Sequence, residues 1–244
     1  MDAHAHAAGT SAEVANSITH GLGALLSVVA LVLLVVPGAL RGSGVRVVTG
    51  AVFGTSLVLL YCMSTLYHAL TNLRAKRVFQ ILDHSAIYVL IAGTYTPFCL
   101  VALRGAWGWS LFGVVWGLAV LGVTFKAVFG DRYEVLSTVV YLGMSWMIVV
   151  AALPLYRCLP AGGLAWLGAG GAFYTLGVGF FAWRGLRFHH AVWHLFVLGG
   201  SLCHVIAVVG YVMPAGIAGQ RVEVERIPAD VHPAAAEGSG GRSR

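Results

Sequence analysis

The residues best able to do chemistry in this chain are a few histidines and one aspartate set in long apolar stretches. Ten of the 244 residues are histidine, whereas between residues 14 and 222 the only acids are Asp83, Asp131 and Glu134. Asp131 and Glu134 share a charged segment with Arg132, but Asp83 stands by itself at the start of an apolar run. Ionisable groups inside such runs are costly to bury and usually serve a function.

The spacing of the last histidines suits metal binding. On a helix, His190 and His194 lie one turn apart on the same face, at about 100° per residue. Two imidazoles at this separation can bind one metal ion. His204 shares the face but lies roughly 15 Å deeper, so we expect it to pair with a polar neighbour. We interpret His84 and His189 as structural or interfacial.

Two further residues complete a candidate zinc site. His68 ends the second apolar stretch and Asp83 begins the third. Three imidazoles and a carboxylate are typical of zinc, which is usually four-coordinate. We predict His68, His190 and His194 as zinc ligands, with Asp83 holding a water or completing the coordination sphere. For the His-x3-His pair alone, simple hydrogen bonding to neighbours is the open alternative.

Membrane helices must position these residues. Hydrophobic residues make up 59% of the chain and charged residues 10%, against about 25% charged residues in soluble domains. A membrane helix needs about 20 apolar residues. Seven such stretches lie near 18–40, 46–68, 83–103, 107–125, 135–156, 163–183 and 190–213. The sequence therefore predicts an all-α, seven-helix, multi-pass protein of the cell membrane.

Polar tails should flank this membrane domain. Residues 1–12 and 219–244 are too polar to form a core, so we predict disordered tails around a membrane domain at 13–218. Basic residues favour cytoplasmic loops, which predicts a cytoplasmic N-terminus, an external C-terminus and a histidine cluster near the cytoplasmic face. The net charge of +6 then reflects loop topology, and we expect no nucleic-acid partner.

Four motifs together resemble a known family. They are Glu13-x2-Asn16-x2-Thr19-His20, Ser64-x3-His68, Asp83-x-Ser85 followed by Gly93, and His190-x3-His194 followed by His204. In this order, over roughly residues 13–213, the chain resembles the hemolysin III proteins. These belong to the wider progestin and adipoQ receptor family, together with the adiponectin receptors.

The resemblance implies a seven-helix bundle with an internal zinc, bound by the three histidines named above, and with Asp83 near a zinc-bound water. Related receptors and alkaline ceramidases suggest hydrolysis of a lipid amide or ester. Asp83 would then act as the base, and Ser64 would hold the water or the substrate carbonyl. Asn16 and His20 would orient the zinc ligands.

Three functions remain open at this stage. The first is a zinc-dependent hydrolase that acts on a membrane lipid. The second is a non-enzymatic sensor or regulator of membrane state, in which zinc has a structural role and a lipid is the ligand. The third is a pore-forming cytolysin, which we favour least because the spans carry no row of charges to line an ion path. The sequence leaves the oligomeric state open.

Overall fold

The computed structural model describes residues 3–214, with side chains from Thr10 onward, and this range contains helices and no strand. The helices are α1 (Ala3–Leu40), α2 (Gly44–Ala69), α3 (Leu73–Pro97), α4 (Gly105–Phe129), α5 (Glu134–Trp146), α6 (Ala152–Cys158), α7 (Ala161–Ala182) and α8 (His189–Ala207). The π-helix η1 (Phe98–Leu103) extends α3, the 3₁₀ turn η2 (Met147–Ala151) joins α5 to α6, and the π-helix η3 (Val208–Val212) extends α8.

Seven helical segments of the described range are long and apolar enough to cross a membrane. They confirm the seven-span prediction, with α5, η2 and α6 together forming one span. The sequence predicted that Asp83 begins the third span. The third segment in fact begins at Leu73, so Asp83 lies well inside α3. The side chain of Asn72 caps this earlier start by accepting hydrogen bonds from the backbone of Arg74 and Ala75.

The two tails predicted at the ends of the chain can be compared with the structure only in part. Helix α1 begins at Ala3, inside the segment 1–12 that the sequence assigns to a tail. The second tail, 219–244, lies outside the described residues. The limits 13–218 and the orientation across the membrane therefore stay predictions.

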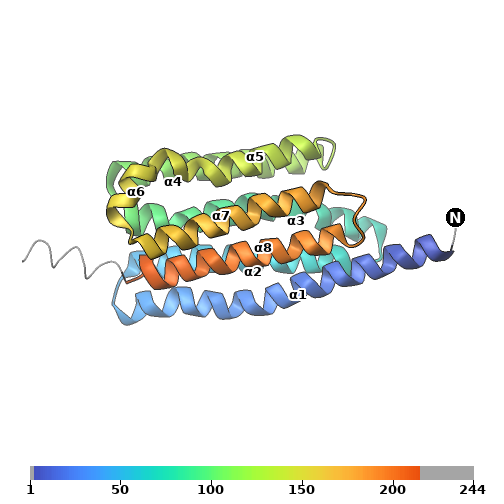
Figure 1. Ribbon diagram of the computed structural model, residues 1–244, viewed down its shortest axis with the longest axis horizontal. Coiled ribbons are helices and arrows are strands. Elements are labelled where there is room, and N and C mark those ends of the chain that lie inside the picture. Colours follow the sequence, from blue (N-terminus) through green and yellow to red (C-terminus); the bar gives the residue numbers. More distant parts are fainter. Residues whose placement is uncertain (1–2, 215–244) are drawn as a thin grey trace, which may run out of the picture. The chain divides into compact units, whose positions relative to one another are not determined.

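The helices pack largely in chain order. Helix α1 contacts α2, α2 contacts α3, α3 contacts α4, and α7 contacts α8. Helix α8 also contacts α1, which brings the first and last spans together. In Figure 1 the start of α8 and the N-terminal half of α1 lie toward the same end of the helices. This end carries the histidines of the candidate site.

A break in the fifth span is stabilised from α3. Pro154 in α6 has no backbone N–H to continue the helical ladder, and the chain forms the turn η2 just before it. The Tyr95 hydroxyl donates to the Met144 carbonyl at 2.8 Å and accepts from the Ile148 backbone N–H at 2.8 Å. These bonds satisfy backbone groups that lipid could not.

Candidate metal centre

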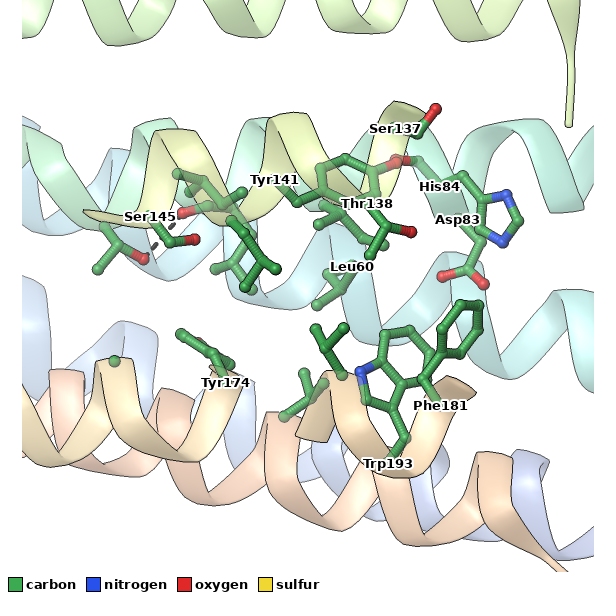
Figure 2. A pocket seen from close by; sticks show the side chains of 18 of the residues that line it. Leu60, Asp83, His84, Ser137, Thr138, Tyr141, Ser145, Tyr174, Phe181 and Trp193 are labelled. Carbon is green, nitrogen blue, oxygen red and sulfur yellow. Dashed lines mark hydrogen bonds between the residues drawn. The ribbon is translucent and has the colours of Figure 1, made fainter. Parts of the chain in front are cut away.

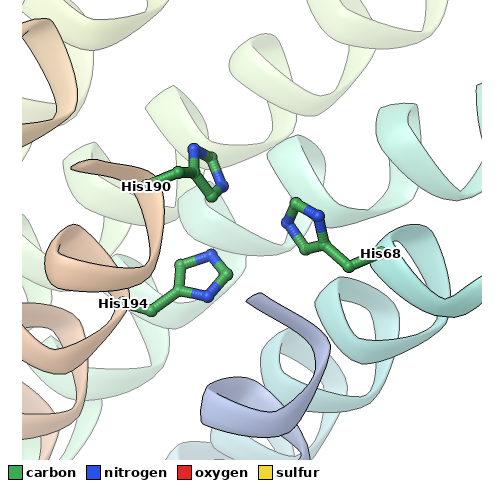
Figure 3. Close-up of side chains that lie close together, drawn as sticks. All are labelled: His68, His190 and His194. Carbon is green, nitrogen blue, oxygen red and sulfur yellow. The ribbon is translucent and has the colours of Figure 1, made fainter. Parts of the chain in front are cut away.

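Three histidines from two helices meet at one end of the bundle. His68 comes from the last turn of α2, and His190 and His194 come from the first turns of α8. One ring nitrogen of each lies within 4.8 Å of the others, and Figure 3 shows the three rings around one point. His194 is fully buried and His68 is 6% exposed. The structure thus brings together the three residues that the sequence predicted as ligands.

The hydrogen bonds of two rings determine which nitrogen is free. His68 Nδ1 contacts the Glu13 carboxylate at 2.7 Å, and His194 Nδ1 contacts the Asn16 carbonyl at 3.2 Å. A carboxylate and a carbonyl accept hydrogen bonds, so both Nδ1 atoms carry the hydrogen. In the described range, the Nε2 atoms of His68, His190 and His194 are all buried without a hydrogen-bond partner. Three buried, unpartnered ring nitrogens in one cluster fit a bound metal ion.

Helix α1 supplies the groups that hold these rings. The Asn16 side chain lies 3.5 Å from His68 Nδ1, and its carbonyl contacts His194 as described. Thr19 Oγ1 lies 3.0 Å from His194 Nδ1, and its own hydroxyl donates to the Asn16 carbonyl at 2.9 Å. Asn16 therefore touches two rings of the cluster, as expected of a residue that orients ligands.

Glu13 is a functional candidate that the sequence reasoning left without a role. Its carboxylate bonds to His68 and also contacts Lys76 Nζ at 3.1 Å. A carboxylate on the far nitrogen of a ligating histidine fixes the ring and raises its basicity. The signal in the sequence is the spacing Glu13, Asn16 and His20, which places all three on one face of α1.

His20 contacts the cluster in a different way. Its ring stacks on that of His194, with centroids 3.4 Å apart and planes at 14°. Both of its nitrogens are buried, and neither has a hydrogen-bond partner among residues 10–214. Its predicted orienting role would thus act through ring contact, and the ring also lines the pocket described below.

Asp83 and Ser64 lie beside the histidines. Asp83 is 4% exposed, and Ser64, one turn before His68, is fully buried. Asp83 is not among the residues whose ligand atoms gather within 4.8 Å of one another. Ser64 Oγ is close to Asp83 and is one of the buried polar atoms that form no hydrogen bond within the described range.

A pocket extends from this end into the bundle between α3, α5, α7 and α8. Asp83 and His84 line one end, and Ser145 and Tyr174 line the part farther away (Figure 2). Leu60, Tyr141 and Trp193 are among the side chains between them. The pocket therefore combines acidic and imidazole groups at one end with a largely apolar wall.

A second charged cluster ties the loop between α4 and α5 to this pocket. Asp131 Oδ1 accepts from Lys126 Nζ at 2.9 Å and lies 2.5 Å from His84 Nδ1. Burial by itself would raise the pKa of the Asp131 carboxyl, but hydrogen bonds and positive charge from His84 and Lys126 lower that pKa to about 2. Lys126 is 1% exposed, so Asp131 neutralises a buried cation.

Comparison with known proteins agrees with this architecture. The family model described as "Haemolysin-III related" matches residues 9–205. "Hemolysin-3" of Bacillus cereus is 49% identical over 202 residues, which cover 83% of this chain and 92% of that protein. The "Hemolysin-3 homolog" of Bacillus subtilis (strain 168) is 49% identical over 199 residues, 82% of this chain and 93% of the relative.

A more distant relative comes from animals. "Monocyte to macrophage differentiation factor" of Homo sapiens is 30% identical over 170 residues, which cover 67% of this chain and 70% of that protein. The family model spans all four sequence motifs and ends shortly before the end of the seventh span. The chain therefore belongs to the haemolysin III family of multi-pass membrane proteins.

Proposed function

We propose that the chain is a zinc-dependent hydrolase that cleaves an amide or ester bond of a membrane lipid. The observation that carries the proposal is the set of three buried Nε2 atoms, each without a hydrogen-bond partner in the part of the chain that the structure describes. They belong to one cluster, which adjoins the pocket through His20 and Asp83.

Zinc fits this donor set better than magnesium or calcium does. Imidazole nitrogen suits zinc, whereas magnesium and calcium prefer oxygen ligands. Three protein ligands leave one tetrahedral position open, as in catalytic zinc sites. Glu13, bound to His68 Nδ1, holds the ring in the orientation that leaves Nε2 for a metal.

The surrounding residues can serve hydrolysis. When bound, zinc would lower the pKa of a coordinated water toward about 7 and polarise a carbonyl oxygen. Asp83 is the nearby carboxylate that can accept the proton of the attacking water. The Ser64 hydroxyl can donate a hydrogen bond to the water or to the substrate carbonyl. The apolar pocket wall suits the acyl chain of a lipid.

A structural role for the metal is the second candidate, and one observation favours it. The three histidines join α2 to α8, and the groups that hold them come from α1. A metal bound there would fasten the first, second and last spans. In this case the protein would act as a sensor or regulator of membrane state, with a lipid as ligand and without turnover.

The name of the Bacillus cereus relative raises lysis of red cells as a third candidate. A pore needs a continuous polar path through the bilayer. The pocket lining includes Leu60, Leu90 and Val197 between its polar ends, which fits an acyl chain better than ions. We therefore place hydrolysis ahead of lysis.

The first test is the metal content of the purified protein in detergent, measured by mass spectrometry. We expect about one zinc per chain in the wild type and its loss in His190→Ala. His189→Ala is the matched control, because the adjacent histidine lies outside the cluster and its removal should leave zinc in place. Well-folded wild type without zinc, even after zinc is supplied, would contradict the proposal.

A further inference from the structure

The inner end of the pocket carries a polar group that the proposed chemistry does not use. His204 lines the pocket and is 6% exposed, in the middle of the seventh span. Its Nδ1 lies 2.7 Å from the carbonyl oxygen of Gly200, one turn earlier in α8. The carbonyl can only accept, so Nδ1 carries the hydrogen.

The other nitrogen of this ring is therefore a hydrogen-bond acceptor. None of the described residues forms a salt bridge with His204, and a buried imidazole with no carboxylate partner is neutral. In the neutral ring Nε2 then has a lone pair. The described residues make no hydrogen bond to Nε2. This atom is nevertheless not one of the fully buried polar atoms that have no partner. It is therefore accessible, beside the pocket that His204 lines.

The ring is held rigidly in this orientation. Tyr174 stacks on it, with centroids 5.4 Å apart and planes at 17°. On another side it lies against Gly170, where an added Cβ would come within 2.3 Å of the ring. The Tyr174 hydroxyl is already engaged with Ser201 Oγ at 3.0 Å, and Ser201 accepts from Tyr61 at 2.7 Å. His204 Nε2 thus supplies an unengaged acceptor in this part of the pocket.

The pocket is polar at two separated points. Asp83 and His84 mark one end in Figure 2, and Tyr174, the stacking partner of His204, marks the other. His194 and His204 are ten residues apart on α8, or about 15 Å along the helix axis. An extended hydrocarbon chain covers this distance in on the order of a dozen carbon–carbon bonds.

We propose that His204 forms a hydroxyl-binding subsite, so that the preferred lipid carries a hydroxyl group on its acyl chain about a dozen carbons from the carbonyl. An ordinary acyl chain would leave Nε2 facing hydrocarbon, and an unpaired buried polar atom is costly. A hydroxyl in lipid has few other partners, so both groups gain from the bond. The inference rests on the proposed function, because it takes the histidine cluster as the place of the carbonyl.

The test is competitive binding to the full-length wild-type protein in nanodiscs. Unlabelled 12-hydroxystearate, 2-hydroxystearate and stearate each compete with radiolabelled stearate. One hydrogen bond predicts that 12-hydroxystearate competes about fivefold more strongly than the other two. The 2-hydroxy isomer controls for polarity, because its hydroxyl cannot reach His204 from the metal end. Equal competition by all three lipids, or no competition by any, would overturn the proposal.

Variants assign the preference to His204. His204→Leu removes the acceptor at similar size and should abolish the preference while stearate still binds. Tyr174→Phe keeps the stacked ring and should retain the preference. Leu202→Ala, on the exposed face of the same helix, controls for general loosening. Loss of the preference in Tyr174→Phe but not in His204→Leu would assign the subsite to the tyrosine and overturn the proposal.

The result can be separated from the fate of the hydrolase proposal. Binding is measured with free fatty acids and needs no turnover. A 12-hydroxy preference in a protein that hydrolyses nothing would sustain the subsite and refute the hydrolase. Hydrolysis with equal rates and affinities for hydroxylated and plain chains would do the reverse. If His204→Leu does not fold, the three-lipid comparison on the wild type still decides the matter.

Discussion

At the scale of single residues, the candidate site depends on which nitrogen each histidine leaves free. His68 and His194 each donate a hydrogen bond from Nδ1, to Glu13 and to Asn16, and this leaves their Nε2 atoms free in the cluster. The His-x3-His pair could be predicted from helical geometry, and His68 from its place at the end of the second apolar stretch. Glu13 as the partner of His68 could not, because the contact depends on how α1 packs against α2, which spacing within one helix does not encode.

Replacing Asp83 with Asn should separate chemistry from metal binding. The amide keeps the size of the side chain but cannot accept the proton, so lipid turnover should fall by about 10²- to 10⁴-fold. Zinc content should be unchanged, because Asp83 lies outside the close ligand group. Lipid turnover and zinc content are measured on the same preparation of each protein. Persisting turnover would exclude Asp83 as the base, whereas lost zinc would make it a ligand.

Glu13→Gln should weaken metal binding without removing any ligand. Loss of the carboxylate charge on His68 lowers the basicity of the ring, and we expect zinc affinity to fall by about 10- to 100-fold. Titration against a chelator of known affinity measures the change. Lys76→Gln is the matched control, since it removes only the other partner of Glu13 and should have a smaller effect. Unchanged affinity in Glu13→Gln would count against its orienting role.

At the scale of elements, hydropathy predicts the spans well and their polar ends poorly. All seven spans follow from apolar runs. The first ten residues of α3, however, include Arg74, Lys76 and Arg77, and these charges make the start of the helix invisible to hydropathy. Hydropathy does not predict the turn η2 either, because this turn depends on hydrogen bonds with Tyr95 in another helix. Apolar content reports burial in lipid, whereas helix caps and breaks depend on individual hydrogen bonds.

The loop between α4 and α5 should be sensitive to Asp131. Asp131→Asn leaves Lys126 buried with a neutral partner, and we expect a loss on the order of 2 kcal/mol in stability. Thermal unfolding in detergent measures it. Glu134→Gln is the matched control, because its partner Arg184 is exposed and such pairs contribute about 1 kcal/mol or less. Equal effects of the two variants would contradict the importance of the buried cation.

The Asp131 carboxylate should also make the stability of the fold depend on pH. Its pKa is about 2 in the folded protein and about 3.9 in an unfolded chain. A lowered folded pKa stabilises the fold above the unfolded value, and this contribution is lost as pH falls from about 4 toward 2. The difference in melting temperature between wild type and Asp131→Asn should therefore shrink over this range. A constant difference would argue against the ionised carboxylate.

At the scale of the whole molecule, the last helix, α8, packs against the first, α1. The histidine cluster lies where these two helices meet α2. A metal that binds only the folded state adds stability, about 4 kcal/mol when its concentration is 1,000 times Kd. Chelator should thus lower the melting temperature of wild type and leave that of His190→Ala unchanged. An equal shift in both would mean that the chelator acts elsewhere.

Because the site joins the first, second and last spans, it can form only late in the protein's biosynthesis. His68 emerges from the ribosome with the second span, but His190 and His194 emerge with the seventh, and synthesis proceeds from the N-terminus. During most of translation, Glu13 and His68 are in place without the residues that complete the cluster. A chain that stalls before its final helix therefore cannot assemble the site, so metal loading would mark completed insertion.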